Sequence, residues 1–199
     1  MPHPIIYINS WPGVGKHTIA KTLETLMKGR ARVVHNHLHI DLAGAILPRS
    51  SQDYPALRHA LRQLLFKTLT TSSDTYDDTF IFTDFQTSND SGTSTAREYA
   101  TAARMRGCTF VPVILTCEMA ENERRMRSKE RVELVAGGKG MLLDVEMLRD
   151  VRRRRDVHEF GIKEELIMDV TELEPVEAAA EILEHVRAVA WELETLMSE

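Results

Sequence analysis

Residues 5–20 combine the residue types that bind a phosphate group, at the spacing that such a site requires. Lys16 follows two glycines, Gly13 and Gly15, and would reach the β and γ phosphates of a nucleotide as a mobile positive charge. Glycines allow backbone N–H groups to curl around an anion, because no Cβ stands in the way. The sequence therefore predicts a nucleotide site at this loop.

Two elements must flank the loop to position it. The apolar run at residues 5–8 predicts a strand, and Ile19, Leu23 and Leu26 repeat at helical spacing, which predicts a helix over about residues 16–27. The first turn of that helix would turn its free N–H groups and positive dipole end toward the phosphate. The residues expected to contact the nucleotide are Pro12, Gly13, Val14, Gly15, Lys16, His17 and Thr18.

The loop departs from the motif G-x-x-x-x-G-K-[S/T] at two positions. Ser10 stands at the first glycine, and His17 stands where the motif has the hydroxyl that binds Mg²⁺. Thr18 follows one residue later, and we expect it to help hold the metal. Residues 79–84 predict an apolar strand that ends in Asp84, whose carboxylate would hold a water molecule of the Mg²⁺ shell.

Composition and charge narrow the class of protein. The chain has 199 residues, enough for one core with a small lid, and 43% hydrophobic and 28% charged residues are ordinary for a globular domain. The net charge of −5 and the lack of a basic face disfavour nucleic acid as a partner. Cys108 and Cys117 have no metal-type spacing and predict buried thiols in a reducing cytosol. No apolar run reaches membrane-spanning length, and the chain enters its first strand without room for a signal peptide, so a cytoplasmic location is expected.

The second predicted strand, residues 32–35, leads into a group of polar residues that could hold an acceptor. Ligands of open α/β sheets bind beyond the carboxyl ends of the strands, which favours Asn36, His37 and Asp41 as acceptor contacts. A different interpretation starts from the alternation of His35, His37 and His39, which in an extended chain would place three metal ligands on one face. We favour the simpler alternative for two of them, in which His35 caps the strand and His39 packs under a helix.

The remaining predicted elements alternate between helices and strands. An amphipathic helix is expected over residues 51–70, with an apolar stripe of Leu57, Leu61, Leu64, Leu65 and Leu69, and with it residues 36–75 would cover the acceptor. Residues 85–95 read as a loop, and Thr95 to Glu98 as a capping box that opens a helix ending near Gly107. Further elements are a strand at 110–115 containing Pro112, a helix at 145–158, a strand at 165–171 and a last helix from Pro175.

An arginine-rich segment followed by glycines, about residues 118–143, predicts a basic lid on a flexible hinge. Guanidinium groups from a closing lid would stabilise the charge of a transferring phosphoryl group. The alternative is a solvated charged face, because glutamates of the same segment could pair with the arginines at helical spacing. Four consecutive arginines, residues 152–155, could simply complement a helix dipole.

Strands that alternate with helices through the whole chain imply a parallel sheet covered on both faces, in one α/β domain over residues 1–199. The Pro-Gly-x-Gly-Lys-x-Thr form of the loop resembles that of adenylate kinase and its small P-loop kinase relatives. Nearly the full length resembles the nucleotide- and shikimate-kinase-like P-loop enzymes. This resemblance implies a three-layer α/β/α fold with strand order 2-3-1-4-5, and ATP and Mg²⁺ as cofactors. A narrower resemblance, to AAA-type small kinases related to chloramphenicol phosphotransferase, rests on residues 9–16, 36–37, 82–84 and 115–117, and on Glu121-Asn122 with Arg125 and Arg131.

The resemblance also implies roles for individual residues. Asp41 would hold or deprotonate the acceptor hydroxyl, with His37 as the second candidate, and Thr171 would border the adenine. Arg125 and Arg131 fit the lid pattern of the small kinases best, with Lys139 a weaker third.

We therefore expect transfer of the ATP γ-phosphoryl group to a small-molecule hydroxyl or phosphate. One alternative is a slow NTP-hydrolysing switch that binds a partner, which His17 in place of the usual hydroxyl favours. Another is a protein that binds nucleotide without chemistry, against which Lys16 and the arginine cluster argue.

Overall fold

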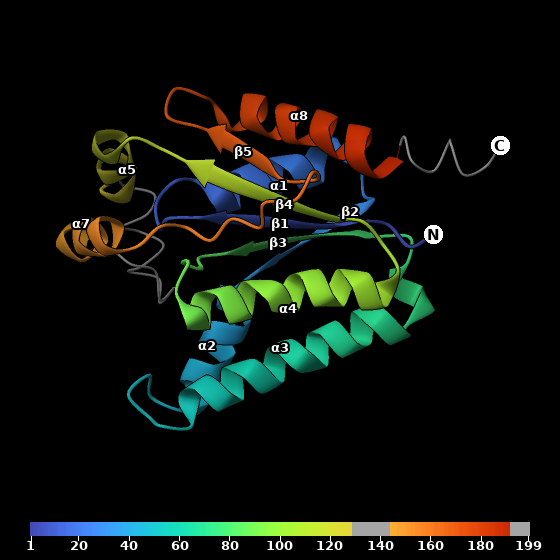
Figure 1. The fold of residues 1–199 in the computed structure, drawn as a ribbon, viewed down its shortest axis with the longest axis horizontal. Helices are drawn as coiled ribbons and strands as arrows, with labels where there is room; N and C mark the ends of the chain where they lie inside the picture. Colours follow the sequence, from blue (N-terminus) through green and yellow to red (C-terminus); the bar gives the residue numbers. More distant parts are fainter. Residues whose placement is uncertain (129–143, 192–199) are drawn as a thin grey trace.

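The computed structural model describes residues 1–128 and 144–191. Its centre is a parallel five-stranded sheet in the order β2-β3-β1-β4-β5 (Figure 1). The strands are β1 (Ile5–Ser10), β2 (Ala31–His35), β3 (Thr79–Asp84), β4 (Phe110–Thr116) and β5 (Leu166–Asp169). The strand order expected from the resemblance is confirmed.

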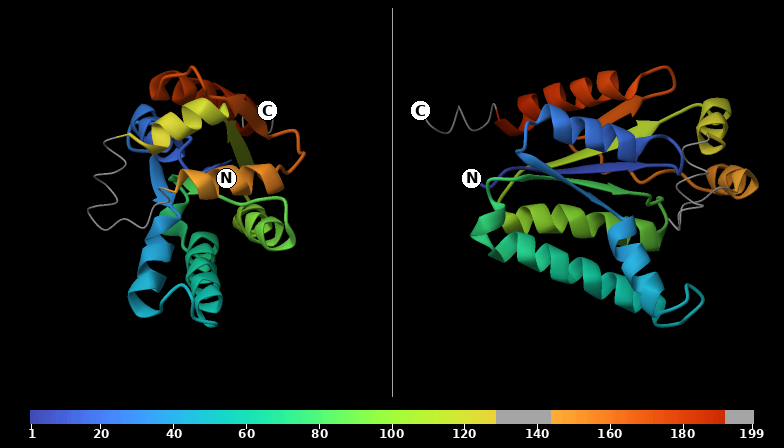
Figure 2. Two further views of the ribbon diagram at one scale, coloured as in Figure 1. Left: turned by 90° about the vertical axis from the view of Figure 1, so that its left-hand side faces the viewer. Right: turned by 180° about the vertical axis from the view of Figure 1, so that it is seen from behind.

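Helices cover both faces of the sheet, so the three-layer α/β/α architecture is also confirmed. Helices α1 (Lys16–Leu26) and α8 (Pro175–Val186) pack together on one face, and α3 (Tyr54–Thr71) and α4 (Asp90–Arg106) lie on the other (Figure 2). Helix α2 (His37–Ile46) precedes α3 and packs against it. Helices α5 (Met119–Met126) and α7 (Val145–Arg154) lie beyond the carboxyl end of β4, and two short helical turns follow α3 and α8, at Ser73–Thr75 and Arg187–Trp191.

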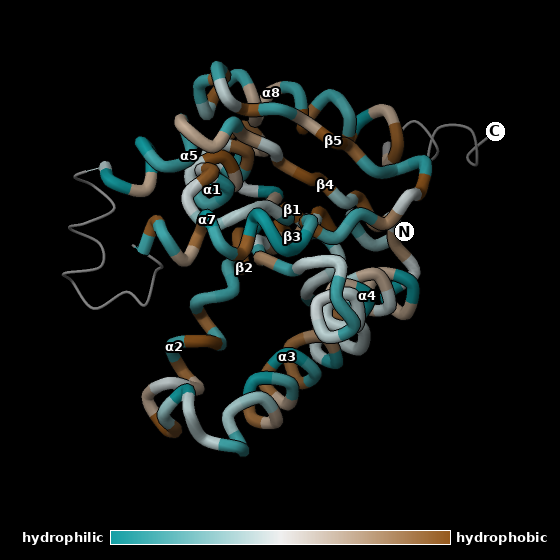
Figure 3. The backbone as a smooth tube through the Cα atoms, turned by 60° about the vertical axis from the view of Figure 1, so that its left-hand side comes forward, coloured by the Kyte–Doolittle hydropathy of each residue, from teal (hydrophilic) through white to brown (hydrophobic). Residues whose placement is uncertain are grey.

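Strand β1 is the best protected part of the chain, because it lies between β3 and β4 and every residue from Ile5 to Ser10 is buried. Its side chains alternate between the two faces: Ile6 and Ile8 join the core under α1 and α8, and Ile5 and Tyr7 join the core under α3 and α4. Burial on both faces explains the uninterrupted apolar run in the sequence. Figure 3 shows the strands among the more hydrophobic segments, with α2 standing apart from the sheet.

Helix α2 lies within the helical segment, about residues 36–75, that was expected to cover the acceptor, although a separate helix was placed only at residues 51–70. Residues two apart on a helix point in widely different directions, so the alternation of His35, His37 and His39 does not place them on one face. Ala43 is buried on the packed side of α2, and the hydroxyl of Tyr54 donates to the Ile40 carbonyl, 3.3 Å away. These contacts hold the segment as a helix against α3.

The start of α4 also differs from the prediction. Asn89 is the N-cap, and its side-chain oxygen accepts from the Gly92 N–H at 2.8 Å, so the expected capping box lies inside the helix. Glu98 instead accepts a bidentate ion pair from Arg62 of α3, with both distances 3.0 Å. Arg62 turns inward, and the buried side of α3 consists of Tyr54, Arg62, Phe66 and Leu69. The buried face of this helix is therefore rotated relative to the predicted stripe of leucines.

Pro112 fits into β4 without a bulge. The pairing of β4 with β5 begins at Val113 opposite Leu166, so at Pro112 the strand has a neighbour on the β1 side only. A proline, which cannot donate a backbone hydrogen bond, is tolerated where one side of the strand is unpaired.

Candidate functional site

The predicted phosphate-binding loop joins β1 to α1 at the carboxyl edge of the sheet. Gly13 and Gly15 both adopt left-handed backbone conformations, with φ of +86° and +110°. A side chain at Gly13 would also meet α5, because its Cβ would lie 2.3 Å from Cγ of Met126. The two glycines are therefore required by the shape of the loop.

Lys16 lies over the loop that precedes it. Its Nζ is 3.2 Å from the carbonyl oxygen of Trp11 and 3.4 Å from that of Ser10. The ammonium group thus sits against the loop carbonyls, near the place where the expected phosphates would bind. Thr18 follows on an exposed part of α1.

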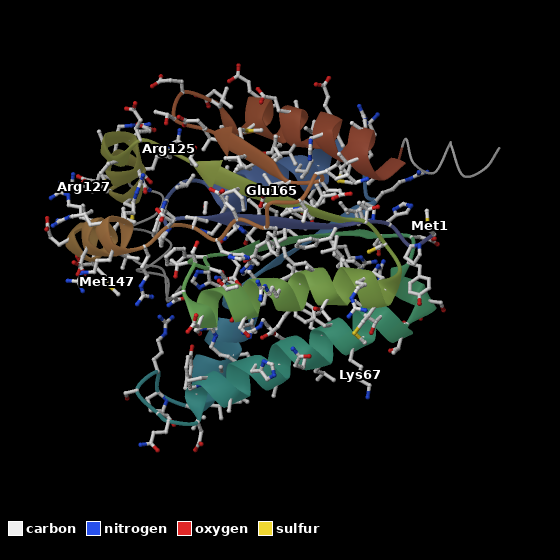
Figure 4. The ribbon with its side chains drawn as sticks, viewed as in Figure 1. Met1, Lys67, Arg125, Arg127, Met147 and Glu165 are labelled. Carbon is white, nitrogen blue, oxygen red and sulfur yellow. The ribbon has the colours of Figure 1, made fainter. Side chains whose placement is uncertain are left out.

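Helix α5 fastens the loop through two side chains. Nδ2 of Asn122 donates to the Pro12 carbonyl at 2.9 Å, and Nη1 of Arg125 donates to the Val14 carbonyl at 2.8 Å. Asn122 is completely buried, and Figure 4 shows Arg125 on α5 beside the end of β4. Helix α5 therefore holds the loop through the main-chain carbonyls of Pro12 and Val14.

Arg125 also links the loop to the segment after β5. Its Nη2 donates to the carbonyls of Val170 and Thr171 at 2.8 and 2.9 Å, and Glu121 accepts from its Nε at 2.6 Å. Thr171, the expected neighbour of the adenine, thus lies one hydrogen bond from the side chain that holds Val14. The other arginine expected over the phosphates, Arg131, lies outside the described residues, as does Lys139.

Arg152 of α7 completes this connection; the sequence had suggested only that it complements a helix dipole, as one of four consecutive arginines. Its guanidinium donates to Oδ1 of Asn122 at 2.8 Å and to the Cys117 carbonyl at 2.9 Å. It also lies 5.7 Å from the ring centroid of Trp11, in the loop itself. Burial lowers the pKa of Arg152, which nevertheless stays charged at neutral pH. Asn122 belonged to a motif of the resemblance and Arg152 to the arginine run, but the sequence did not predict their contacts with the loop.

Asp84, expected to serve the metal, lies at the centre of a second network. Oδ1 accepts from Nδ2 of Asn36 at 2.9 Å and from the Phe85 N–H at 2.8 Å. Oδ2 accepts from Nε2 of Gln86 at 2.9 Å and from the Tyr99 hydroxyl at 3.0 Å. The network brings the end of β3 together with Asn36, one of the expected acceptor residues.

The other two expected acceptor residues lie near the start of α2, His37 as its first residue and Asp41 one turn later. Nδ1 of His37 is 3.6 Å from Oδ1 of Asp41, beyond hydrogen-bond length. Burial lowers the pKa of His37 and outweighs the opposing effect of Asp41; the positive charge of Lys16 lowers it further.

Two more histidines lie between these parts. The ring of His17, at the motif's metal position, meets that of His35 at the end of β2, with centroids 4.9 Å apart and planes at 84°. The ring of His35 is in turn 6.2 Å from that of His37. In the part of the chain that the structure describes, no three His, Cys, Asp or Glu side chains form a group that could hold a metal ion by themselves.

No protein-family model matches the sequence, and no curated protein matches it. Solved structures do resemble the fold. A gluconokinase from Sinorhizobium meliloti is 14% identical with a TM-score of 0.60, over 98% of this chain and 97% of the other. A putative kinase from Chloroflexus aurantiacus is 16% identical with a TM-score of 0.63, over 94% and 98% of the two chains.

A third similar structure was solved with ligands bound. The APS kinase of Mycobacterium tuberculosis, in complex with AMPPNP and APS, is 16% identical with a TM-score of 0.57, over 94% of this chain and 98% of the other. At these identities the similarity concerns the fold. Together with the glycine loop and the strand order, it shows that the chain has the fold of the P-loop kinases.

Proposed function

We propose that this protein transfers the γ-phosphoryl group of ATP to a small-molecule acceptor. The observation that carries the proposal is the meeting of the loop with the first turn of α2 at one sheet edge, through the successive rings of His17, His35 and His37. Similarity to kinases of small molecules supports it.

The loop residues from Pro12 to Thr18 would hold the phosphates, and Lys16 would neutralise charge between the β and γ groups. Arg125 and Thr171 would border the nucleotide on the side of the base. Arg131 is proposed to close over the transferring group. A divalent cation bound with the nucleotide, for which Thr18 and Asp84 are the expected residues, would neutralise further charge during transfer.

On the acceptor side, Asn36, His37 and Asp41 would orient a hydroxyl or phosphate oxygen toward the γ phosphorus. In the transfer, the acceptor oxygen forms a bond to phosphorus as the bond to the β-phosphate oxygen breaks. For a hydroxyl acceptor, the proton passes to Asp41 or His37, and ADP leaves. Hydrogen bonding to Asp84 fixes Asn36 in place for this task.

The test is ATP turnover with a divalent cation, alone and with a panel of sugars, nucleosides, nucleoside monophosphates and aromatic alcohols, following ADP and phosphorylated product by mass spectrometry. We expect ADP formation to depend on one class of acceptor. We also expect Lys16→Ala to lose about 10²-fold or more in turnover, because it removes positive charge from the developing transition state. Lys21→Ala is the matched control, since Lys21 is an exposed lysine of the same helix paired with Glu24. Full turnover in Lys16→Ala would contradict the assignment of the loop.

His17 favours a second candidate function, a nucleotide-hydrolysing switch. The residue replaces the hydroxyl that positions the metal in the usual motif, which suits slow chemistry. Slow hydrolysis that is independent of every acceptor tested would support this candidate over the kinase.

A further inference from the structure

Helices α5 and α7 pack together beyond the carboxyl end of β4 and carry many arginines (Figure 1). Most of the arginines in these helices and just beyond them form ion pairs with carboxylates of the same two helices. The pairs are Arg124 and Arg125 with Glu121, Arg127 and Arg149 with Glu123, and Arg154 with Asp150. Most of the positive charge on these helices is therefore balanced by a neighbouring carboxylate.

Arg152 of α7 differs, because the groups that it contacts are uncharged. Its guanidinium meets Oδ1 of Asn122, the carbonyl of Cys117 and the ring of Trp11. In the part of the chain that the structure describes, Arg152 forms no ion pair with a carboxylate, although its side chain is half-buried. A charge that is partly removed from water is costly unless an opposite charge balances it. The balancing charge would come from outside the protein.

The guanidinium lies against the loop that is proposed to hold the phosphates. It is 5.7 Å from the ring centroid of Trp11, and Nζ of Lys16 is 3.2 Å from the carbonyl oxygen of the same residue. Two positive charges beside one loop residue repel each other, and both attract an anion that binds to the loop. Because Arg152 is half-buried, its attraction for the anion is screened less than that of an exposed charge.

Hydrogen bonds hold this charge in a fixed position relative to the loop. A guanidinium only donates hydrogen bonds, so Oδ1 of Asn122 must face Arg152, and Nδ2 then faces the Pro12 carbonyl. One side chain thus connects Arg152 to the loop backbone. A charge that is already in place does not have to reorganise when an anion arrives.

We propose that Arg152 raises the affinity of the loop for the phosphate groups of the nucleotide, through its charge and without contacting them. The inference rests on the proposed nucleotide site and names a residue that determines its affinity. It predicts that the contribution of Arg152 grows with the number of phosphate groups on the ligand. The alternative is a purely structural residue that holds Asn122, Cys117 and Trp11 together.

The first experiment compares ligands that differ in charge. Wild type and Arg152→Gln are titrated by calorimetry with adenosine, ADP and AMPPNP. We expect the variant to bind ADP about tenfold more weakly, AMPPNP more weakly still, and adenosine with an affinity within about twofold of wild type. Arg153→Gln is the matched control, because it removes the same charge from an exposed position of the same helix, and it should change each affinity by less than about twofold.

The second experiment separates charge from hydrogen bonding. Arg152→Lys keeps the positive charge but loses the planar group that bonds both Asn122 and Cys117. We expect its ADP affinity to stay within about threefold of wild type. A tenfold loss would mean that the hydrogen bonds matter and the charge does not, which overturns the inference. This measurement decides alone if Arg152→Gln does not fold.

The outcomes also separate the inference from the function on which it rests. Unchanged ADP affinity in Arg152→Gln, or an equal loss for adenosine and ADP, overturns the inference and leaves the kinase proposal standing. A selective loss of phosphate ligands in a protein without acceptor-dependent turnover would support the inference and contradict the kinase. Failure of the wild-type protein to bind both ADP and AMPPNP would overturn both.

Discussion

Replacing Asp84 by asparagine tests whether this carboxylate holds the site together. The side chain is 1% exposed, and its two oxygens accept from Asn36, the Phe85 N–H, Gln86 and Tyr99. An amide of the same shape keeps one oxygen and replaces the other by an NH₂ group. Two of the four donors would then face a donor instead of an acceptor.

The expected cost follows from these bonds. A buried donor left unsatisfied costs about 1–3 kcal/mol, and two such donors would cost about 2–6 kcal/mol. The amide can orient so that its oxygen keeps the two stronger hydrogen bonds. We therefore expect Asp84→Asn to lower the free energy of unfolding by about 3 kcal/mol.

The assay is urea unfolding at pH 7, followed by far-UV circular dichroism and analysed by linear extrapolation. Tyr99→Phe removes a single donor, and we expect a loss of about 1.5 kcal/mol. The double variant should lose less than the sum of the two, because phenylalanine removes a donor that asparagine would leave unsatisfied. Asp74→Asn, at an exposed carboxylate, is the control and should change stability by less than about 0.5 kcal/mol.

Two results would refute this reasoning. The first is an Asp84→Asn protein as stable as the wild type, which would mean that the four donors are satisfied without the carboxylate. The second is a double variant whose loss equals the sum of the single losses, which would mean that Asp84 and Tyr99 do not interact.

Three further substitutions probe the loop and its supports. Gly13→Ala combines a left-handed φ with a contact of 2.3 Å to Met126, so we expect unfolding to become easier by about 2–4 kcal/mol in urea; adding Met126→Ala should relieve the clash and leave the backbone penalty. Asn122→Ala removes the partner of both the Pro12 carbonyl and the half-buried Arg152, and we expect the affinity for ADP in calorimetry to fall about tenfold. Ion pairing with arginines lowers the pKa of Glu121 from 4.5 to about 2. Its contribution is therefore complete above pH 4.5 and lost as the pH falls toward 2, so thermal unfolding of Glu121→Gln should differ from wild type by about 1 kcal/mol at pH 6 and converge with it near pH 2.

Each of these expectations has a contrary result. Gly13→Ala with wild-type stability would show that the loop adopts another backbone shape. Unchanged ADP affinity in Asn122→Ala would show that α5 does not position the loop. A constant difference between Glu121→Gln and wild type from pH 6 to pH 2 would show that the ion pair is not its source.

The fold was predictable largely because the buried parallel strands carry continuous apolar runs. Residues 5–8 and 79–84 lie in β1 and β3, as predicted, since burial on both faces leaves no room for polar alternation. Strand order came from the resemblance, because the pattern of a single strand does not say which strand lies beside it.

The errors arose where distant contacts decide the local structure. Thr95 to Glu98 has the form of a capping box, but Glu98 pairs with Arg62, 36 residues away, and Asn89 caps α4 instead. The alternating histidines likewise gave no sign of where helix α2 begins, because α2 is stabilised by contacts with α3.

The candidate site was predictable to the same limited extent. The glycines and Lys16 were visible because a single continuous segment carries the motif. The contacts of Asn122 and Arg152 were not predictable, because they depend on how α5 and α7 meet the loop.

The attachment of the loop to α5 has a consequence for how an anion would be recognised. In a planar trans peptide, the carbonyl and the following N–H point in opposite directions. Because the carbonyls of Pro12 and Val14 are turned outward to Asn122 and Arg125, the N–H groups of Gly13 and Gly15 are turned away from α5. These donors therefore lose their conformational freedom when the chain folds. A phosphate that binds there does not have to order the loop, so less entropy is lost on binding.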